Sequence, residues 1–189
     1  MGREGRQLRP GGDPLGTHRS LEPRGALPQP AARLDNDFTG IFDGELLVHV
    51  DTLNIDAASF RQMEEVSGGT DDGIRAEVQK TVTARGKQHN PVTGSGGMLL
   101  GRVVAWENRE DESLAVGDRI ATLVSLSLTP LHITSLGVVR RASAQIDVDG
   151  EAVLFRSSAY AKLPSDLPER LALAVLDVAG AAPQVARLA

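Results

Sequence analysis

Hydrophobic and polar residues alternate in two different periods along the first half of the chain. Residues 44–55 (GELLVHVDTLNI) predict a strand, because apolar side chains recur on one face behind the turn signal Asp43-Gly44. Residues 56–66 predict a helix with Asp56 as its N-cap and Gly68-Gly69 as its stop. Residues 71–86 predict a second, amphipathic helix, whose apolar positions lie four apart at Ile74, Val78 and Val82.

The second half of the chain is dominated by strand patterns. Residues 98–106 (MLLGRVVAW) predict a strand, and residues 111–126 predict another with a tight turn at 116–118. Residues 131–157 predict a hairpin that turns at Asp149-Gly150, since Asp-Gly is a strong hairpin signal.

Both ends of the chain differ from this strand-rich centre. Residues 1–15 predict a disordered tail, followed by an extended arm and by one domain over residues 16–189. After Pro168 the pattern predicts a helix capped by Asp166, with an apolar face of Leu171, Ala174, Val175 and Val178. The fold class that these elements predict is α+β, built on a partly open β-barrel with peripheral helices.

Composition narrows the function classes. Aromatic residues are 3% of the chain and the formal net charge is -5, which argues against a nucleic-acid partner. There is no cysteine, so thiolate metal sites and cysteine nucleophiles are excluded. We find no signal peptide and no apolar run long enough for a membrane span, and we expect a cytoplasmic protein without a membrane partner.

Three segments resemble the GroES-like catalytic domain of the medium-chain dehydrogenases and reductases. They are the glycine-rich residues 94–101, residues 114–121 (LAVGDRIA) and residues 161–188. Longer segments resemble the L-erythro-3,5-diaminohexanoate dehydrogenase family more closely. These are residues 16–36, 50–60, 85–101 (RGKQHNPVTGSGGMLLG), 117–131 and 166–188.

The closer resemblance implies an NAD-dependent oxidative deamination of a diamino acid in lysine fermentation. It also implies a Rossmann domain after the terminal helix and a homo-oligomeric full-length protein. No G-x-G-x-x-G motif occurs in the 189 residues, so we expect the catalytic domain alone, with NAD bound mainly elsewhere. The TGSGG stretch at 93–97 precedes a predicted strand rather than a helix, which favours a cleft wall over a phosphate cradle.

The resemblance also places the candidate site residues. Zinc-dependent relatives of the wider group carry metal ligands at positions that match Asn54, Ser95 with Gly96, and Asp177. This set offers one carboxylate where a catalytic zinc needs about three ligands, so we predict no zinc. The histidines at 18, 49, 89 and 132 have no metal-ligand spacing, and we expect His49 to be structural.

Asp56 and Asp177 are the predicted catalytic residues. Two carboxylates suit a substrate with two ammonium groups, because they can orient the amine and remove its proton. Lys87 and His89 are predicted to meet the substrate carboxylate or to move protons, and Asn54 and Ser95 to bind substrate.

Each of these residues also has a structural interpretation. Asp56 can act only as a helix cap, and Asp177 can form an internal salt bridge. Ser95 can belong to a turn, Asn54 can bond the strand-end backbone, and Lys87 and His89 can be ordinary loop residues. Two other function classes stay open: a non-enzymatic GroES-like binding or assembly module, and a zinc-free quinone or enoyl reductase domain.

Overall fold

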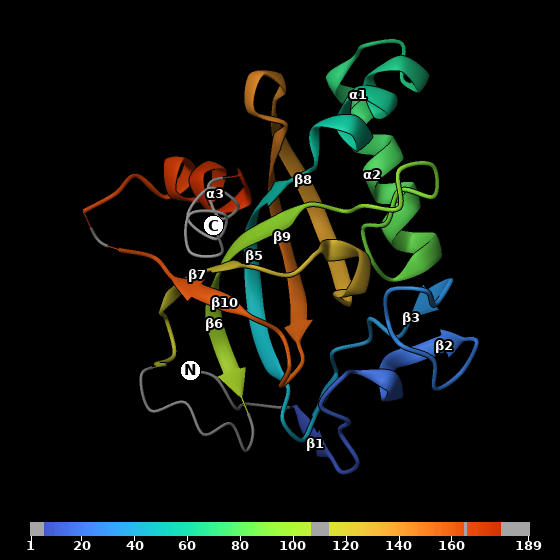
Figure 1. Ribbon diagram of the computed structural model, residues 1–189, viewed down its shortest axis with the longest axis vertical. Coiled ribbons are helices and arrows are strands. Elements are labelled where there is room, and N and C mark those ends of the chain that lie inside the picture. Colours follow the sequence, from blue (N-terminus) through green and yellow to red (C-terminus); the bar gives the residue numbers. More distant parts are fainter. Residues whose placement is uncertain (1–5, 107–113, 165, 179–189) are drawn as a thin grey trace, which may run out of the picture.

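An open antiparallel sheet forms the centre of the computed structural model, which describes residues 6–106, 114–164 and 166–178. Its strand order is β10-β7-β6-β5-β9-β8, so β8 and β10 lie at its two ends and the sheet does not close into a barrel. The α+β class is confirmed (Figure 1). The strands are β5 (Leu46–Asn54), β6 (Met98–Trp106), β7 (Arg119–Thr122), β8 (Leu131–Arg140), β9 (Gln145–Leu154) and β10 (Tyr160–Lys162).

Helices cover the two ends of this sheet. Figure 1 shows α1 (Ala57–Val66) and α2 (Asp71–Arg85) on the side of β8, and α3 (Glu169–Val178) on the side of β7. The two predicted helices at 56–66 and 71–86 are confirmed, and Asp56 is the N-cap of α1. Gly86 ends α2 in the left-handed region at φ 66°, as glycine C-caps do. No helix among the described residues is long and apolar enough to cross a membrane.

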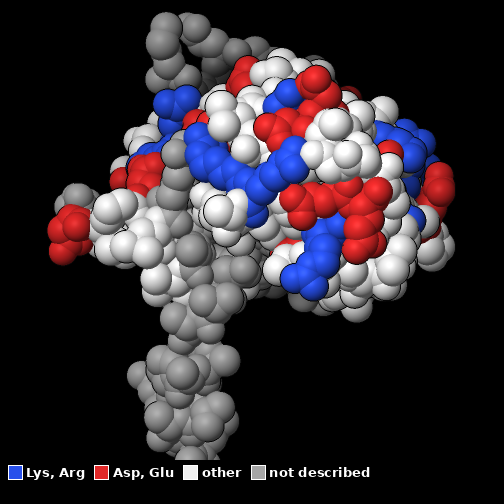
Figure 2. Space-filling model, turned by 90° about the horizontal axis from the view of Figure 1, so that it is seen from above, with Lys and Arg blue, Asp and Glu red and all other residues white. Residues whose placement is uncertain are grey.

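The main core lies between α1, α2 and the sheet. The predicted apolar face of α2 is confirmed, because its three residues four apart are all buried there. On the outside of α2, charged residues form the ion pairs Asp72–Arg75 and Glu77–Lys80, and Asp71 pairs with Arg141. Seen from the top of the view in Figure 1, the surface carries acidic and basic side chains that are intermixed (Figure 2).

The N-terminal arm is built from short strands that run alongside the sheet. They are β1 (Gln7–Arg9), β2 (Ser20–Glu22), β3 (Arg33–Leu34) and β4 (Gly40–Phe42), with a 3-10 turn η1 (Thr17–Arg19) before β2. Strand β1 pairs in parallel with β4. Strand β1 itself lies within residues 1–15, where the sequence predicts a disordered tail. An ion pair of 2.5 Å between Arg6 and Glu151 of β9 holds the start of the arm against the sheet.

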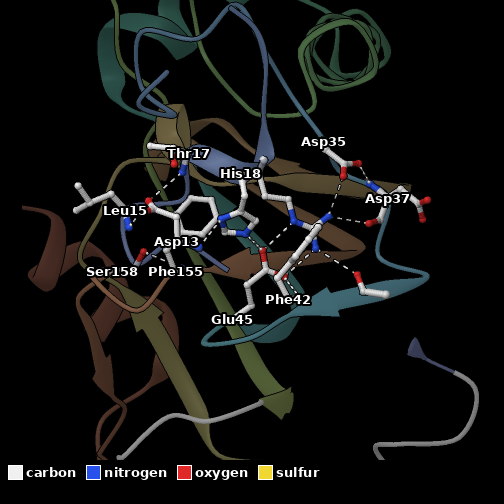
Figure 3. A network of polar contacts seen from close by, with 12 residues as sticks. Asp13, Leu15, Thr17, His18, Asp35, Asp37, Phe42, Glu45, Phe155 and Ser158 are labelled. Atoms are coloured by element: carbon white, nitrogen blue, oxygen red, sulfur yellow. Dashed lines mark hydrogen bonds and ion pairs between the residues drawn. The ribbon is translucent and has the colours of Figure 1, made fainter. Parts of the chain in front are cut away.

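A buried ion pair attaches the arm to the start of β5 (Figure 3). The guanidinium of Arg19 donates two hydrogen bonds of 2.8 Å to the carboxylate of Glu45, and both side chains are buried. His18 accepts a hydrogen bond from the Asp13 N–H at Nδ1, so its Nε2–H is the donor to Glu45 at 2.8 Å. Because both charges are out of water, this pair must stay complete for the arm to remain in place.

The predicted hairpin turn at Asp149-Gly150 is wrong. Both residues lie inside β9, and the chain reverses instead in the 3-10 turn η3 (Arg141–Ser143), where Ala144 adopts φ 51°. A Cβ on Gly150 would lie 2.4 Å from the carbonyl oxygen of His132. This glycine therefore serves the close approach of β8 and β9 rather than a turn.

The predicted apolar face of α3 is also wrong where it is described. Leu171 and Val175 are 51% and 43% exposed, whereas Ala172 and Leu173 are buried. Leu173 packs in a small cluster with Met98, Leu100 and Ala121, so that patch of the sheet selects the buried face. The side chains of Ala174 and Val178 lie outside the described part of the structure.

Candidate functional site

A cavity of about 400 Å³ opens between the sheet and α3. Four segments meet there: the start of α1, the glycine-rich loop before β6, the segment after β7, and α3. The cavity brings together two of the predicted site residues, Asp56 and Ser95. Its full lining is Asp56, Ser95, Gly97, Met98, Leu123, Val124, Ser125 and Leu176.

Asp56 presents a carboxylate oxygen that the fold leaves unused. Its Oδ1 accepts the backbone N–H of Ser59 at 2.9 Å and so caps α1. Its Oδ2 is buried and has no hydrogen-bond partner among the described residues. A buried, unpaired carboxylate oxygen is costly, and a donor from a ligand would relieve that cost. Capping and ligand binding are therefore both open to this one side chain.

The glycine-rich loop is packed tightly against the end of β5. Gly97 has φ 92°, and a Cβ there would lie 2.0 Å from the carbonyl oxygen of Asn54. A hydrogen bond of 2.6 Å between the hydroxyls of Thr93 and Ser59 joins the loop to α1. This close packing holds Ser95 at the same cavity as Asp56, and the loop leads into a strand as predicted.

Asn54 and Lys87 face other parts of the molecule. The Asn54 Oδ1 accepts a hydrogen bond of 3.1 Å from Gln145, and Asn54 is not among the cavity residues. Lys87 is fully buried, and its Nζ donates to the carbonyl oxygens of Pro28 and Gln29 at 2.7 and 2.9 Å. Burial lowers the pKa of the Lys87 amine to about 8, and the charge of Arg85 acts in the same direction.

His89 is partly buried, and its Nδ1 has no hydrogen-bond partner among the described residues. Burial, followed by the charges of Lys87 and Arg85, lowers its pKa below the ordinary value of 6.5. His89 is therefore neutral at pH 7 and suits proton transfer better than binding of a carboxylate.

Asp177 is placed only by its helix. It lies in α3 next to Leu176, which lines the cavity, but its own side chain lies outside the described part of the structure. Among the described residues no group of three or more His, Asp or Glu is arranged to hold a metal ion.

No pattern in the sequence points to Ser125 or Gln88 as site residues. Ser125 caps the 3-10 turn η2 (Leu126–Leu128) and is one of the residues that line the cavity. Gln88 is fully buried, and neither polar atom of its amide has a described hydrogen-bond partner. In the sequence both residues occupy ordinary loop positions. The burial of Gln88 and the place of both residues beside the glycine-rich loop follow from tertiary packing, which the sequence does not show.

Fold and cavity together define an α+β domain with a small, mostly apolar site that contains one carboxylate with a free oxygen. The chain matches the L-erythro-3,5-diaminohexanoate dehydrogenase N-terminal domain over residues 18–164, and it belongs to that family.

Two curated relatives carry the same name. The chain is 52% identical over 178 residues to L-erythro-3,5-diaminohexanoate dehydrogenase of Fusobacterium nucleatum, covering 92% of this chain and 50% of that protein. It is 51% identical over 175 residues to L-erythro-3,5-diaminohexanoate dehydrogenase of Acetoanaerobium sticklandii, with shares of 92% and 51%. The chain thus spans about half the length of these relatives.

Proposed function

We propose that this chain is the catalytic-domain portion of an NAD-dependent L-erythro-3,5-diaminohexanoate dehydrogenase of lysine fermentation. The reaction is the oxidative deamination of the diamino acid to 5-amino-3-oxohexanoate and ammonia. The observation that carries the proposal, beside family membership, is the unpartnered Oδ2 of Asp56 at the cavity. We also propose that the open sheet is structurally related to the GroES-like barrel.

The cavity suits an ammonium group on an aliphatic chain. Met98, Leu123 and Leu176 supply apolar walls, and Asp56 Oδ2 is an acceptor for a charge-assisted hydrogen bond. In the proposed reaction Asp56 takes a proton from the ammonium on C3, and the hydride of C3 would pass to the oxidised nicotinamide of NAD, which serves as the electron acceptor. Water adds to the resulting imine, and loss of ammonia leaves the ketone.

The remaining predicted residues take secondary roles in this proposal. Ser95 hydrogen-bonds the substrate from the same wall, and Asp177 supplies a second anionic site for the other ammonium group. His89, neutral at pH 7, moves protons. Asn54 and Lys87 would meet substrate only after leaving the partners that they have in the structure.

The glycine-rich loop lacks the geometry of a dinucleotide-binding loop. The glycine-rich loop leads into β6, so no helix N-terminus follows it to receive a pyrophosphate. We propose that NAD binds mainly to a region that corresponds to the part of the relatives that this chain does not span. Exposed Leu123 at the cavity, together with exposed Leu171 and Val175 of α3, supports a covering surface of that kind. We propose further that the full-length protein is a cytoplasmic homo-oligomer and that it uses no zinc.

The test is NADH formation from 3,5-diaminohexanoate, measured with this chain and with a chain of the relatives' full length. We expect turnover by the long form and none by the short form. Absence of turnover in both would contradict the substrate and favour a binding module. Turnover of a quinone or an enoyl compound in place of the diamino acid would identify a reductase.

A further inference from the structure

The attachment of α3 to the sheet is thin on its apolar side. Among the described residues of α3, Ala172 and Leu173 are buried, Leu176 is partly buried against the same cluster as Leu173, and Leu171 and Val175 are exposed. The helix α2, by contrast, buries Ile74, Val78 and Val82. Among the side chains that the structure describes, α3 therefore contributes less buried apolar packing than α2.

An arginine of β7 supplies the missing constraint. Arg119 donates from Nε and Nη2 to the two carboxylate oxygens of Glu169 at 2.7 and 2.5 Å. Its Nη1 hydrogen-bonds Asp51 of β5. The two parallel bonds to Glu169 fix orientation as well as distance, which a single contact does not. One guanidinium thus joins β5, β7 and the first turn of α3.

The far end of the same helix forms the cavity wall. Leu176 lies seven residues after Glu169, about 10 Å along the helix axis. A rotation of α3 about its small buried patch would move Leu176 relative to Asp56 and Ser95 across the cavity. From this geometry we propose that Arg119 is a positioning residue, which sets the width of the substrate cavity by clamping the start of α3 to the sheet. The substrate part of this inference rests on the function proposed above.

A matched control exists elsewhere in the chain. Arg141 donates from Nε and Nη2 to Asp71 at 2.9 and 2.7 Å, and Asp71 is the first residue of α2. Both ion pairs are partly exposed and contribute little stability on their own, so the apolar packing of each helix decides the effect of losing its pair. Because α2 is held by three buried residues, loss of Arg141 should leave its helix in place, whereas loss of Arg119 should release α3.

The first measurement is amide hydrogen exchange in this chain with Arg119→Gln, Arg119→Lys and Arg141→Gln. We expect Arg119→Gln to speed exchange in α3 and in the cavity segments 95–97 and 123–125 by about tenfold, with β5 unchanged. Arg119→Lys should give an intermediate exchange rate, because lysine keeps the positive charge but cannot make the two parallel hydrogen bonds to Glu169. Arg141→Gln should leave α3 and the cavity unchanged.

The second measurement is steady-state kinetics of the full-length form with 3,5-diaminohexanoate. Arg119→Gln should raise KM about tenfold with kcat within about twofold, the pattern of lost substrate positioning. Unchanged exchange in α3 would overturn the clamp, and faster exchange with an unchanged KM would overturn its role at the cavity. If the wild type shows no turnover, the proposed function fails, and exchange in the cavity segments still decides the clamp.

Discussion

Lys87 is a fully buried lysine that donates its hydrogen bonds to backbone carbonyl oxygens of the arm. Its charge has little contact with water, which is why its pKa falls from 10.5 to about 8. The sequence places it in a polar loop beside the glycine-rich stretch, where a role at the substrate is a reasonable prediction. Its side chain points toward the arm because its hydrogen-bond acceptors lie there. That contact is a matter of tertiary packing, which the local sequence pattern does not show.

This lowered pKa predicts an unusual pH dependence of stability. Between pH 8 and 10.5 the folded state binds fewer protons than the unfolded state, so stability rises with pH through that window. The rise is at most about 3 kcal/mol. Lys87→Met should remove it in urea unfolding measured across this pH range, whereas Lys80→Met, at an exposed lysine of α2, should retain it. An identical rise in both variants would contradict this account of Lys87.

The glycine-rich loop is the element on which the cavity depends most. Gly97→Ala combines a positive φ with a Cβ only 2.0 Å from a backbone oxygen, so it must displace the loop. Gly94→Ala has φ 72° and no heavy atom within 4 Å of the new Cβ, so it carries the backbone strain alone. We expect a loss of about 1 kcal/mol for Gly94→Ala and at least twice that for Gly97→Ala in chemical unfolding. Equal losses would show that the close approach is unimportant.

For helices and strands, the sequence predicts well those features that depend on neighbouring residues alone. The four-residue spacing of α2 and the cap at Asp56 are local signals, and both are confirmed. The face of α3 is not local, because the helix is apolar on several sides and the patch at Met98, Leu100 and Ala121 selects one of them. Likewise Gly150 carries a turn signal in the sequence, but its position beside β8 requires a residue without a side chain.

The whole molecule depends on a polar network that joins the arm to the sheet. Burial acts to raise the pKa of Glu45, but hydrogen bonds from Arg19 and His18 outweigh it and hold the pKa below its ordinary value. Glu45 therefore contributes stability above its unfolded pKa, and that contribution is lost as pH falls through the lower folded value. Neither the burial of Arg19 nor its partner is evident from the sequence, since the two residues lie 26 positions apart.

Glu45→Gln should destabilise the protein by about 3–5 kcal/mol at neutral pH, because it leaves Arg19 buried without its counter-charge. Thermal unfolding at pH 7 and at acidic pH measures the effect, and the variant should lose less stability than the wild type on acidification. Glu77→Gln, which removes an exposed ion pair with Lys80, should change stability by less than about 0.5 kcal/mol. A loss of similar size in both variants would contradict a central role for the buried pair.

We propose that Asp56 performs chemistry at the cavity as well as capping α1. Asn caps helices as well as Asp does, so Asp56→Asn keeps the fold and removes the base. The most direct measurement is NADH formation from 3,5-diaminohexanoate by full-length Asp56→Asn protein, with Asp72→Asn at an exposed position of α2 as the control. A catalytic role for Asp56 predicts that kcat falls by roughly 10²–10⁴-fold for Asp56→Asn, with unchanged thermal stability, and that the control matches the wild type. Turnover of Asp56→Asn within about twofold of the wild type would contradict it.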